Sequence, residues 1–267
     1  MNKGGLEKSI AMKITFIGAG NLATNLCQAA YDACHEIAEV YSRTEASASV
    51  LANMVNAPYT TDLSTVNTES DIYIVSVKDA VLEQVAAELS KRVGDRLIVH
   101  TAGSMPMDIL PSCRRGVFYP MQTFSRKKKV DFSTIPCFLE AQSADDLARL
   151  HQFAASITDS IYDMGSNDRR YLHLAAVFCC NFANHCYAIG AELLKEHGNI
   201  PFEVMLPLIS ETASKLYHLS PAEAQTGPAV RWDNNVIDKQ ITLLSSQPQW
   251  QEIYRLISQS IHSASEK

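Results

Sequence analysis

Residues 13–23 read K-I-T-F-I-G-A-G-N-L-A, and this stretch decides the fold. Its first residues are typical of a buried strand, and those from Asn21 onward have the spacing of a helix. Between them, residues 18–23 give the pattern G-x-G-x-x-A, whose glycines permit a tight turn and a close approach of the backbone to a pyrophosphate. Free N–H groups at the helix start would attract the phosphate oxygens. The stretch therefore predicts a dinucleotide-binding strand–turn–helix with these cofactor-binding residues: Gly18, Ala19, Gly20, Asn21 and Leu22.

The tip of the second predicted strand indicates which dinucleotide to expect. An NAD site usually has a carboxylate there, which accepts hydrogen bonds from the ribose hydroxyls. Here the chain reads Y-S-R-T over residues 41–44, without a carboxylate. The guanidinium of Arg43 and the hydroxyls of Ser42 and Thr44 are donors that suit a 2′-phosphate. We therefore expect NADP, with NAD and a solvated Arg43 as the alternative.

Further ligand contacts are expected where other strands end, because ligands of such sheets bind outside the carboxyl ends of the strands. The predicted strands at residues 71–77 and 96–101 lead into S-V-K and H-T-A-G-S. We expect six of these residues to contact the cofactor: Ser76, Val77, Lys78, Thr101, Ala102 and Gly103. His100 and Ser104 are expected at the substrate, although a histidine at a strand end is often only hydrogen-bonded.

Short apolar runs alternate with helical stretches as far as residue 164. Strands are expected at residues 13–18, 37–42, 57–61, 71–77, 96–101, 135–140 and 160–164, and helices at residues 21–33, 45–56, 79–91 and 144–158. This alternation predicts right-handed βαβ units. The expected fold class is therefore α/β, a Rossmann-type doubly wound parallel sheet.

Beyond residue 165 the pattern is helical throughout, with helices expected at residues 169–197 and 201–219 and in two later segments. The chain thus divides into an N-terminal extension (residues 1–11), an NADP-binding domain (residues 12–164) and an all-α domain for substrate binding and dimerisation (residues 165–267). About 100 residues are few for an independent core, so we expect the helical domain to share surface with the sheet and with a second subunit.

The composition excludes several classes of protein. Apolar residues make up 46% and charged residues 19%, which excludes disorder as the main state. The net charge of −6 argues against binding to nucleic acid or to an anionic membrane. Residues 171–191 carry no charge and are about long enough to cross a bilayer, but the histidines and asparagines among them would be costly there. This run therefore predicts a buried helix.

The seven cysteines indicate a reducing compartment. Their number is odd, they include no C-x-x-C pair, and the first eleven residues do not resemble a secretory signal. We therefore expect reduced thiols and a cytoplasmic location. A metal site among the cysteines and histidines of residues 173–186 is conceivable, but we expect none.

The charge-free run offers candidate catalytic groups. On an uninterrupted α-helix over residues 169–197, one face about a quarter of the circumference wide would hold three polar side chains: His173, Asn181 and Asn184. His173 could protonate a carbonyl or imine that the amides orient; the alternative is a core helix with internally satisfied polar groups. Arg231 and Asp233 could pair with each other or hold a substrate carboxylate.

These motifs resemble a family of Rossmann-like NADP oxidoreductases that is grouped with the deazaflavin-dependent NADP oxidoreductases. The resemblance covers residues 12–262 and rests on F-I-G-A-G-N-L-A, S-R-T, V-K-D, H-T-A-G-S, Y-P-M-Q-T-F, R-Y-L-H and G-P-A-V-R-W-D. More distantly, the chain is similar to pyrroline-5-carboxylate reductases and to 3-hydroxyacid and 6-phosphogluconate dehydrogenases. The resemblance implies a helical C-terminal domain like that of the 6-phosphogluconate dehydrogenases, which packs against the cofactor cleft and commonly forms dimers.

The chain also departs from these relatives. The hydroxyacid dehydrogenases use a lysine on the first long helix after the cofactor domain, but no lysine occurs between Lys129 and Lys195. The serine- and glycine-rich loop of the pyrroline-5-carboxylate reductases is missing. Trp232 stands where many relatives have a glycine, which leaves the shape of that pocket open.

The expected function is transfer of a hydride between NADP(H) and a small carbonyl, imine or hydroxy compound. The alternative is a non-catalytic NADP-binding sensor or regulatory protein, which the missing lysine favours. Hydride exchange between NADP and a deazaflavin rests on the resemblance alone. The expected partners are a small-molecule substrate and a second copy of the chain, without nucleic acid or membrane.

Overall fold

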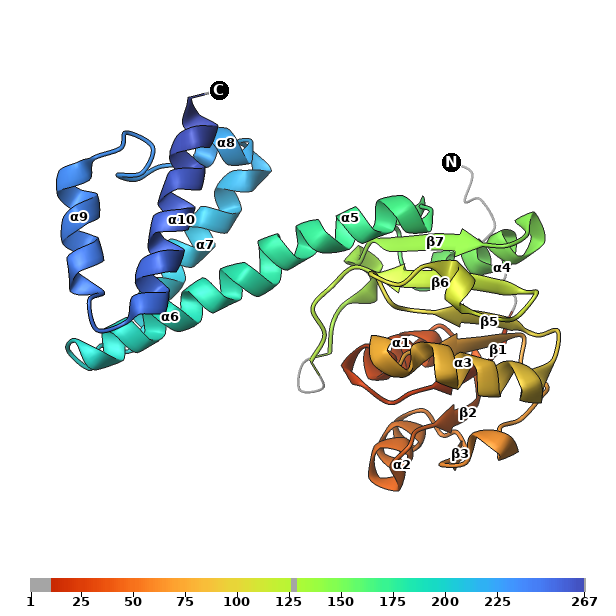
Figure 1. The fold of residues 1–267 in the computed structure, drawn as a ribbon. Helices are drawn as coiled ribbons and strands as arrows, with labels where there is room; N and C mark the ends of the chain where they lie inside the picture. Colours follow the sequence, from red (N-terminus) through yellow and green to blue (C-terminus); the bar gives the residue numbers. More distant parts are fainter. Residues whose placement is uncertain (1–10, 126–128, 267) are drawn as a thin grey trace, which may run out of the picture. The chain divides into compact units, whose positions relative to one another are not determined.

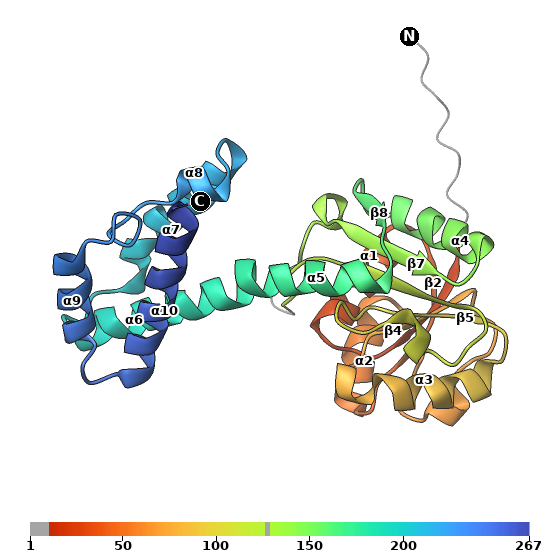
Figure 2. The ribbon, with the colours of Figure 1, turned by 45° about the horizontal axis from the view of Figure 1, so that its top comes forward.

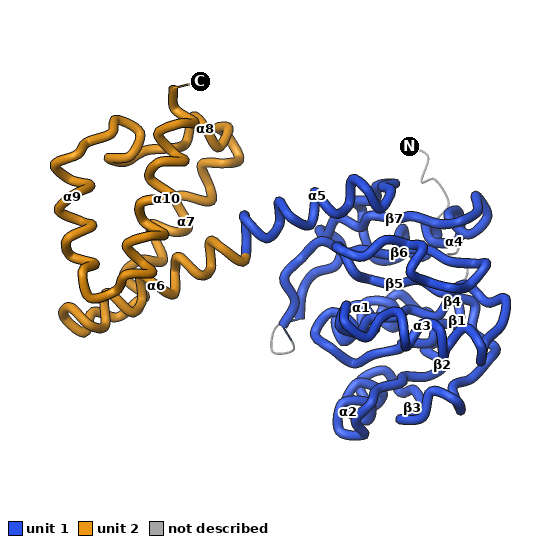
Figure 3. The backbone as a smooth tube through the Cα atoms, viewed as in Figure 1, with its two compact units in different colours: residues 1–180 blue, residues 181–267 orange. Residues whose placement is uncertain are grey.

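A computed structural model describes residues 11–125 and 129–266 (Figure 1). The chain forms two compact units, residues 1–180 and 181–267 (Figure 3). The predicted N-terminal extension lies, apart from Ala11, outside the described residues.

The first unit is built on an eight-stranded sheet with the order β3-β2-β1-β4-β5-β6-β7-β8. All neighbouring strands are parallel except β6 and β7, which are antiparallel. The strands are β1 (Lys13–Ile17), β2 (Glu36–Tyr41), β3 (Tyr59–Thr60), β4 (Ile72–Val75), β5 (Leu97–His100), β6 (Arg115–Pro120), β7 (Cys137–Ala141) and β8 (Ile161–Asp163).

Helices cover both faces of this sheet, and the apolar core is divided accordingly. One face packs against α1 (Asn21–Asp32), α2 (Glu45–Met54) and α4 (Ala144–Ala155). The other packs against α3 (Asp79–Val93) and, near β6 and β7, against α5 (Ser166–Ala176). Figure 2 shows α3 and α4 on opposite sides of the strands. The central strand β4, I-Y-I-V, is buried on both faces, as its unbroken apolar run predicts.

The expected doubly wound fold is confirmed, but two features of the sheet differ from the prediction. The sequence analysis missed β6, whose Gly116 and terminal Pro120 make a weak strand pattern. It also expected a parallel strand at residues 135–140, whereas β7 is antiparallel to β6. The described residues between these two strands contain no α-helix, and an antiparallel pair does not need the crossover that a parallel pair needs.

The long helical segment also departs from expectation. The sequence analysis predicts one α-helix over residues 169–197, but a π-helical stretch, Val177–Phe182, separates α5 from α6 (Ala183–Glu196). The arithmetic that placed three polar side chains on one face is therefore wrong across this stretch, because a π-turn is wider than an α-turn. The last strand ends at Asp163 and α5 begins at Ser166, whereas the compact units divide between residues 180 and 181, inside this helical segment.

The second unit is helical and has little core of its own. Besides α6 it contains α7 (Leu206–Ser214), α8 (Pro221–Ala224), α9 (Asn234–Leu243) and α10 (Pro248–Ser265). Among its described residues, the buried ones are Ala229, Ile237, Leu244 and Ser258. The segment Ser166–Glu196 is long and apolar enough to cross a membrane by length and composition. The prediction of a buried helix at residues 171–191 is wrong for the single chain, because none of these residues is buried in it.

Candidate active site

The turn between β1 and α1 has the geometry that a pyrophosphate requires. Gly18 has a φ of +118°, and a Cβ there would lie 2.2 Å from the carbonyl oxygen of Ser76. Gly20, by contrast, faces open space. No side chain caps the start of α1 and its first turn holds no acid, so the helix end can attract an anion. These residues fit a dinucleotide phosphate.

The end of β2 presents the donors that the sequence predicts for a 2′-phosphate. Arg43 and Thr44 are exposed, and Thr44 begins α2 without a side-chain capping bond. The strand's own acid, Glu39, is engaged elsewhere, because its carboxylate accepts a hydrogen bond from the N–H of Asn67 at 2.8 Å. Glu45 accepts one from the Tyr59 hydroxyl at 3.2 Å. The two acids nearest the tip in sequence therefore already accept hydrogen bonds from other groups.

The ends of β4 and β5 are joined side by side at the same edge of the sheet. The hydroxyl of Thr101 donates a hydrogen bond to that of Ser76 at 3.1 Å. Ser76 also lies close to Gly18, because a Cβ at Gly18 would be 2.2 Å from its carbonyl oxygen, so predicted cofactor residues that follow β1, β4 and β5 lie close together. Ser104 is exposed, and its hydroxyl donates to the carboxylate of Asp79 at 2.5 Å.

Two proton-carrying side chains meet beyond the end of β5. The hydroxyl of Tyr119, on β6, lies 3.1 Å from Nδ1 of His173, on α5. A Cβ at Gly103 would lie 2.6 Å from that nitrogen and 2.7 Å from the tyrosine ring, so only glycine lets the loop pass this pair. Burial raises the pKa of Tyr119, and the charge of Arg169 opposes this in part. The phenol is therefore protonated at neutral pH and able to donate.

His100 is not available to a substrate. It has no exposed surface, and its Nδ1 accepts a hydrogen bond from the N–H of Ala102 while Nε2 lies 3.2 Å from the carbonyl oxygen of Pro106. Burial, with a smaller effect of the Arg169 charge, lowers its pKa to about 4. The neutral ring therefore holds the backbone of the loop after β5 and presents no exposed surface to the expected substrate.

Comparisons with known proteins identify the family of this chain. Residues 13–103 match the family model described as NADP oxidoreductase, coenzyme F420-dependent, and residues 135–261 match a domain of unknown function (DUF2520). The crystal structure of a Bacteroides fragilis protein assigned as an NADP oxidoreductase has 50% sequence identity, covers 96% of this chain and 100% of its own, and has a TM-score of 0.91. This chain belongs to the NADP oxidoreductase family.

Two more distant structures share the fold of this oxidoreductase. A 1-pyrroline-5-carboxylate reductase from Streptococcus pyogenes has 17% identity, covers 95% of this chain and 99% of its own, and has a TM-score of 0.64. An imine reductase from Myxococcus stipitatus, in complex with NADP+, has 15% identity, covers 94% and 92%, and has a TM-score of 0.63. No curated protein matches the chain significantly. The expected cofactor, NADP, is confirmed by the family.

Four predicted site residues of this oxidoreductase lie in the second unit: Asn181, Asn184, Arg231 and Asp233. Both asparagines are exposed, and Asn181 lies in the π-helical stretch. The carboxylate of Asp233 accepts a hydrogen bond from the N–H of Val236 at 3.4 Å and caps α9. Within the described residues, Arg231 and Asp233 form no ion pair.

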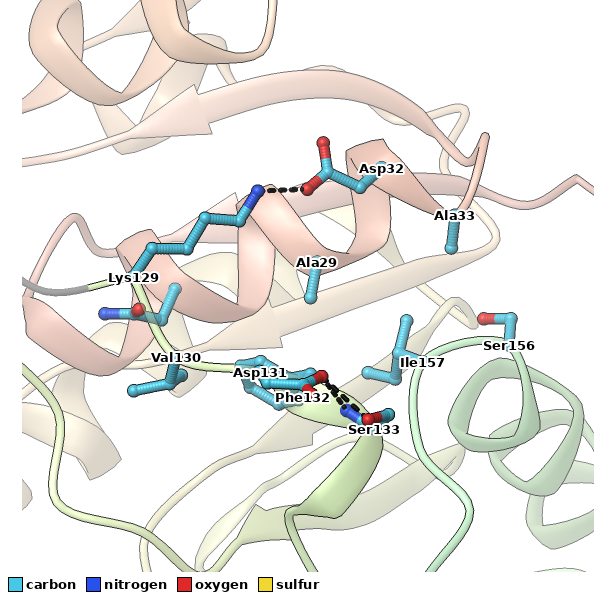
Figure 4. Close-up of a pocket in the computed structure, with 11 residues that line it drawn as sticks. Ala29, Asp32, Ala33, Lys129, Val130, Asp131, Phe132, Ser133, Ser156 and Ile157 are labelled. Atoms are coloured by element: carbon cyan, nitrogen blue, oxygen red, sulfur yellow. Dashed lines mark hydrogen bonds and ion pairs between the residues drawn. The ribbon is translucent and has the colours of Figure 1, made fainter.

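A cavity of about 590 Å³ opens at the C-terminal end of α1, at the opposite end of that helix from the phosphate turn (Figure 4). The charged groups at its wall are engaged with their neighbours. Lys129 pairs with Asp32 at 2.7 Å, and the carboxylate of Asp131 accepts hydrogen bonds from Ser133. The described residues that line this cavity include no tyrosine–histidine pair like that of the candidate active site, and we do not place the substrate there.

Tyr119 is the site residue that the sequence analysis did not single out. It lies on β6, the strand that the analysis missed. The motif Y-P-M-Q-T-F begins at Tyr119 and was quoted only as part of the resemblance. Recognising V-F-Y-P as a strand end would have placed it at the same edge as His100 and Thr101.

Proposed function

We propose that the protein reduces a C=N or C=O bond of a small compound with NADPH, and that Tyr119 and His173 deliver the proton. The observation that carries this proposal is the 3.1 Å contact between the Tyr119 hydroxyl and Nδ1 of His173 beside Gly103. The contact lies at the sheet edge that also holds the phosphate turn, where ligands of such sheets bind.

Several residues would hold NADP. The phosphate turn, Gly18 to Leu22, would bind the pyrophosphate, and Ser42, Arg43 and Thr44 would bind the 2′-phosphate. Ser76, Val77, Lys78 and the loop from Thr101 to Gly103 would continue the site along the edge. Bound NADPH supplies a hydride. Since NADH lacks the 2′-phosphate, replacing Arg43 with alanine should raise the dissociation constant of NADPH and leave that of NADH unchanged.

The protein's own part in the reaction is the transfer of a proton. Reduction leaves excess negative charge on the substrate nitrogen or oxygen, which a positioned acid neutralises. In the proposed mechanism Tyr119 donates its phenolic proton to that atom. The imidazole of His173, half-buried and in contact with the phenol, returns a proton to Tyr119 from the solvent side. This pair would take the role for which related dehydrogenases use a lysine.

We propose further that the protein is a homodimer assembled through its helices. Large apolar side chains are exposed along this part of the chain, among them Leu174, Phe178, Leu208, Tyr217 and Leu243. A mostly apolar groove of about 340 Å³ lies between α6, α9 and α10. Exposed apolar surface of this extent is typical of protein interfaces. A second copy would also cover the apolar segment Ser166–Glu196 without a membrane.

A cytoplasmic location is also part of the proposal. In the described part of the chain, which includes all seven cysteines, none is paired in a disulfide. Reduced thiols are the rule in the cytosol. Assay of cell fractions for the protein tests this location, and recovery in the membrane or secreted fraction would contradict it.

The catalytic proposal is tested with NADPH and a panel of small cyclic imines, ketones and aldehydes, by following the loss of reduced-nicotinamide absorbance. We expect turnover of at least one compound, and a fall in kcat of about 10²–10⁴-fold in Tyr119→Phe and His173→Ala. Both variants should bind NADPH with the wild-type dissociation constant. Unchanged kcat in both variants would exclude the proton-delivery role.

A further inference from the structure

The loop that follows β5 runs along one face of α5. The carbonyl oxygen of Met105 accepts a hydrogen bond from Nη2 of Arg169 at 2.7 Å, and the N–H of Met107 donates one to the Ser166 hydroxyl at 2.9 Å. Further along α5, on the same face, His173 lies next to Gly103, where a Cβ would be 2.6 Å from its Nδ1. The helix residues in these contacts are three and four positions apart: Ser166, Arg169 and His173.

Arg169, in the middle of this face, is the largest fully buried side chain of the described residues. Its Nη1 donates to the carboxylate of Glu140, on β7, at 2.5 Å. The Ser166 hydroxyl donates to the same carboxylate at 2.7 Å. Burial by itself would raise the pKa of Glu140, but the hydrogen bonds and the charge of Arg169 outweigh it and lower this pKa. The pair is therefore ionised at neutral pH.

The planar guanidinium thus joins three separate segments. One nitrogen holds the sheet through Glu140, and the other holds the loop through the carbonyl oxygen of Met105. Arg169 itself belongs to the helix that carries His173, one turn further on. A lysine has a single ammonium group and would not span both partners in this way.

We infer that Arg169, with Glu140, is a positioning residue that sets the distance between His173, Tyr119 and the glycine loop. The inference rests on the proposed function of the Tyr119–His173 pair. The hydrogen bonds of Arg169 to described residues go to Glu140, Met105 and Ser166 and not to Tyr119 or His173, so it acts through the helix and the loop that it connects. Its charge also reaches the pair, because it lowers the pKa of Tyr119 against the effect of burial.

The test is the substitution Arg169→Lys, which removes the planar guanidinium and keeps the positive charge. The first measurement is the NMR signal of Nδ1 of His173 in the protein saturated with NADP+, because this signal reports the hydrogen bond with Tyr119. We expect this signal to shift. We also expect kcat to fall by about ten- to a hundredfold for the compound that the wild type reduces, with KM changed less than twofold. An unchanged Nδ1 signal together with unchanged kcat would overturn the inference.

A matched control separates positioning from general stability. Arg114 pairs with the buried carboxylate of Asp146 at 2.5 Å, in the same unit, and links the start of β6 to α4. Arg114→Lys should lower the melting temperature without moving the His173 signal or kcat. Equal effects of both variants on the signal would overturn the inference. Should Arg169→Lys not fold, Glu140→Asp shortens the same bridge and is read by the same criteria.

The outcomes also distinguish this inference from the proposed function. If Tyr119→Phe and His173→Ala keep full turnover, the proposed function fails. If they lose turnover while Arg169→Lys keeps the wild-type signal and kcat, only the positioning role fails. If no compound in the panel is reduced, the His173 signal still decides whether Arg169 sets the geometry of the pair.

Discussion

His100 shows at the scale of one residue how a buried group adds a pH-dependent term to stability. Its folded-state pKa, about 4, lies below the ordinary value of 6.5 because burial, with a smaller effect of the Arg169 charge, outweighs the opposing charges of Glu140 and Asp79. The unfolded chain therefore binds the proton more tightly than the folded one does. The stability that His100 contributes is fully present above pH 6.5 and is lost as the pH falls toward 4.

The difference between the folded and unfolded pKa of His100 predicts how the stability of the fold falls in acid. Between about pH 6.5 and pH 5, the free energy of unfolding should fall by about 1.5 kcal/mol more in the wild type than in His100→Gln, which keeps a donor for Pro106. Denaturant titrations at several pH values measure both slopes. His35, whose pKa is also lowered by burial, is present in both proteins and cancels in the comparison. Equal slopes would contradict the buried neutral state of His100.

At the scale of an element, the phosphate turn contains two glycines that serve different purposes. Gly18 is held at positive φ, and a Cβ there would lie 2.2 Å from the carbonyl oxygen of Ser76, directly after β4, so glycine is needed for folding. Gly20 adopts a φ of −77°, which any residue tolerates, and has no neighbour within 4 Å of a Cβ position. The fold of the free protein therefore does not require glycine at this position, whereas the close approach of a phosphate would require it.

The two glycines accordingly make a matched pair of variants. Gly18→Ala should lower the free energy of unfolding by about 2 kcal/mol or more, since both the backbone angle and the space are wrong for a side chain. Gly20→Ala should leave the free energy of unfolding within about 0.5 kcal/mol of the wild type and raise the NADPH dissociation constant about tenfold or more. Denaturant melts and fluorescence titration with NADPH distinguish them. Normal NADPH binding by Gly20→Ala would argue against a pyrophosphate at this turn.

At the scale of the whole molecule, the two units differ in how completely they bury their apolar side chains. The sheet unit has a continuous apolar core on both faces, whereas the helical unit buries few side chains and exposes many large apolar ones. Burial of a leucine stabilises by about 1.5–3 kcal/mol, so this uncovered surface is a strong driving force for association. The helical unit is therefore expected to be stable only against a second copy.

The dimer can be tested with two substitutions at equally exposed residues. Leu174, on α5, is 50% exposed, and Val50, on α2, is 51% exposed. Leu174→Gln should raise the dimer dissociation constant about tenfold or more, since each copy loses apolar contact, while Val50→Gln should leave it unchanged. Sedimentation equilibrium gives both constants. A wild-type protein that stays monomeric at micromolar concentration would rule out the dimer.

The sequence by itself determined the features that depend on neighbouring residues. The phosphate turn needs glycine, alanine and a helix start within six positions, and the tip of β2 needs donors within four. Such local patterns are visible without the fold, and so are the alternating strands and helices of the first unit. The family confirms the cofactor that these patterns predict.

Only the tertiary structure decided which side chains meet near the end of β5. Tyr119 and His173 are 54 positions apart, and their contact depends on β6 lying beside β5 and on α5 packing against β6 and β7. The same folding buried His100, which the sequence analysis had placed at the substrate. The physical reason is that a side chain's surroundings come from strand order and helix packing, which sum many weak contacts over the whole chain, whereas a turn or a helix start is set by the few residues that form it.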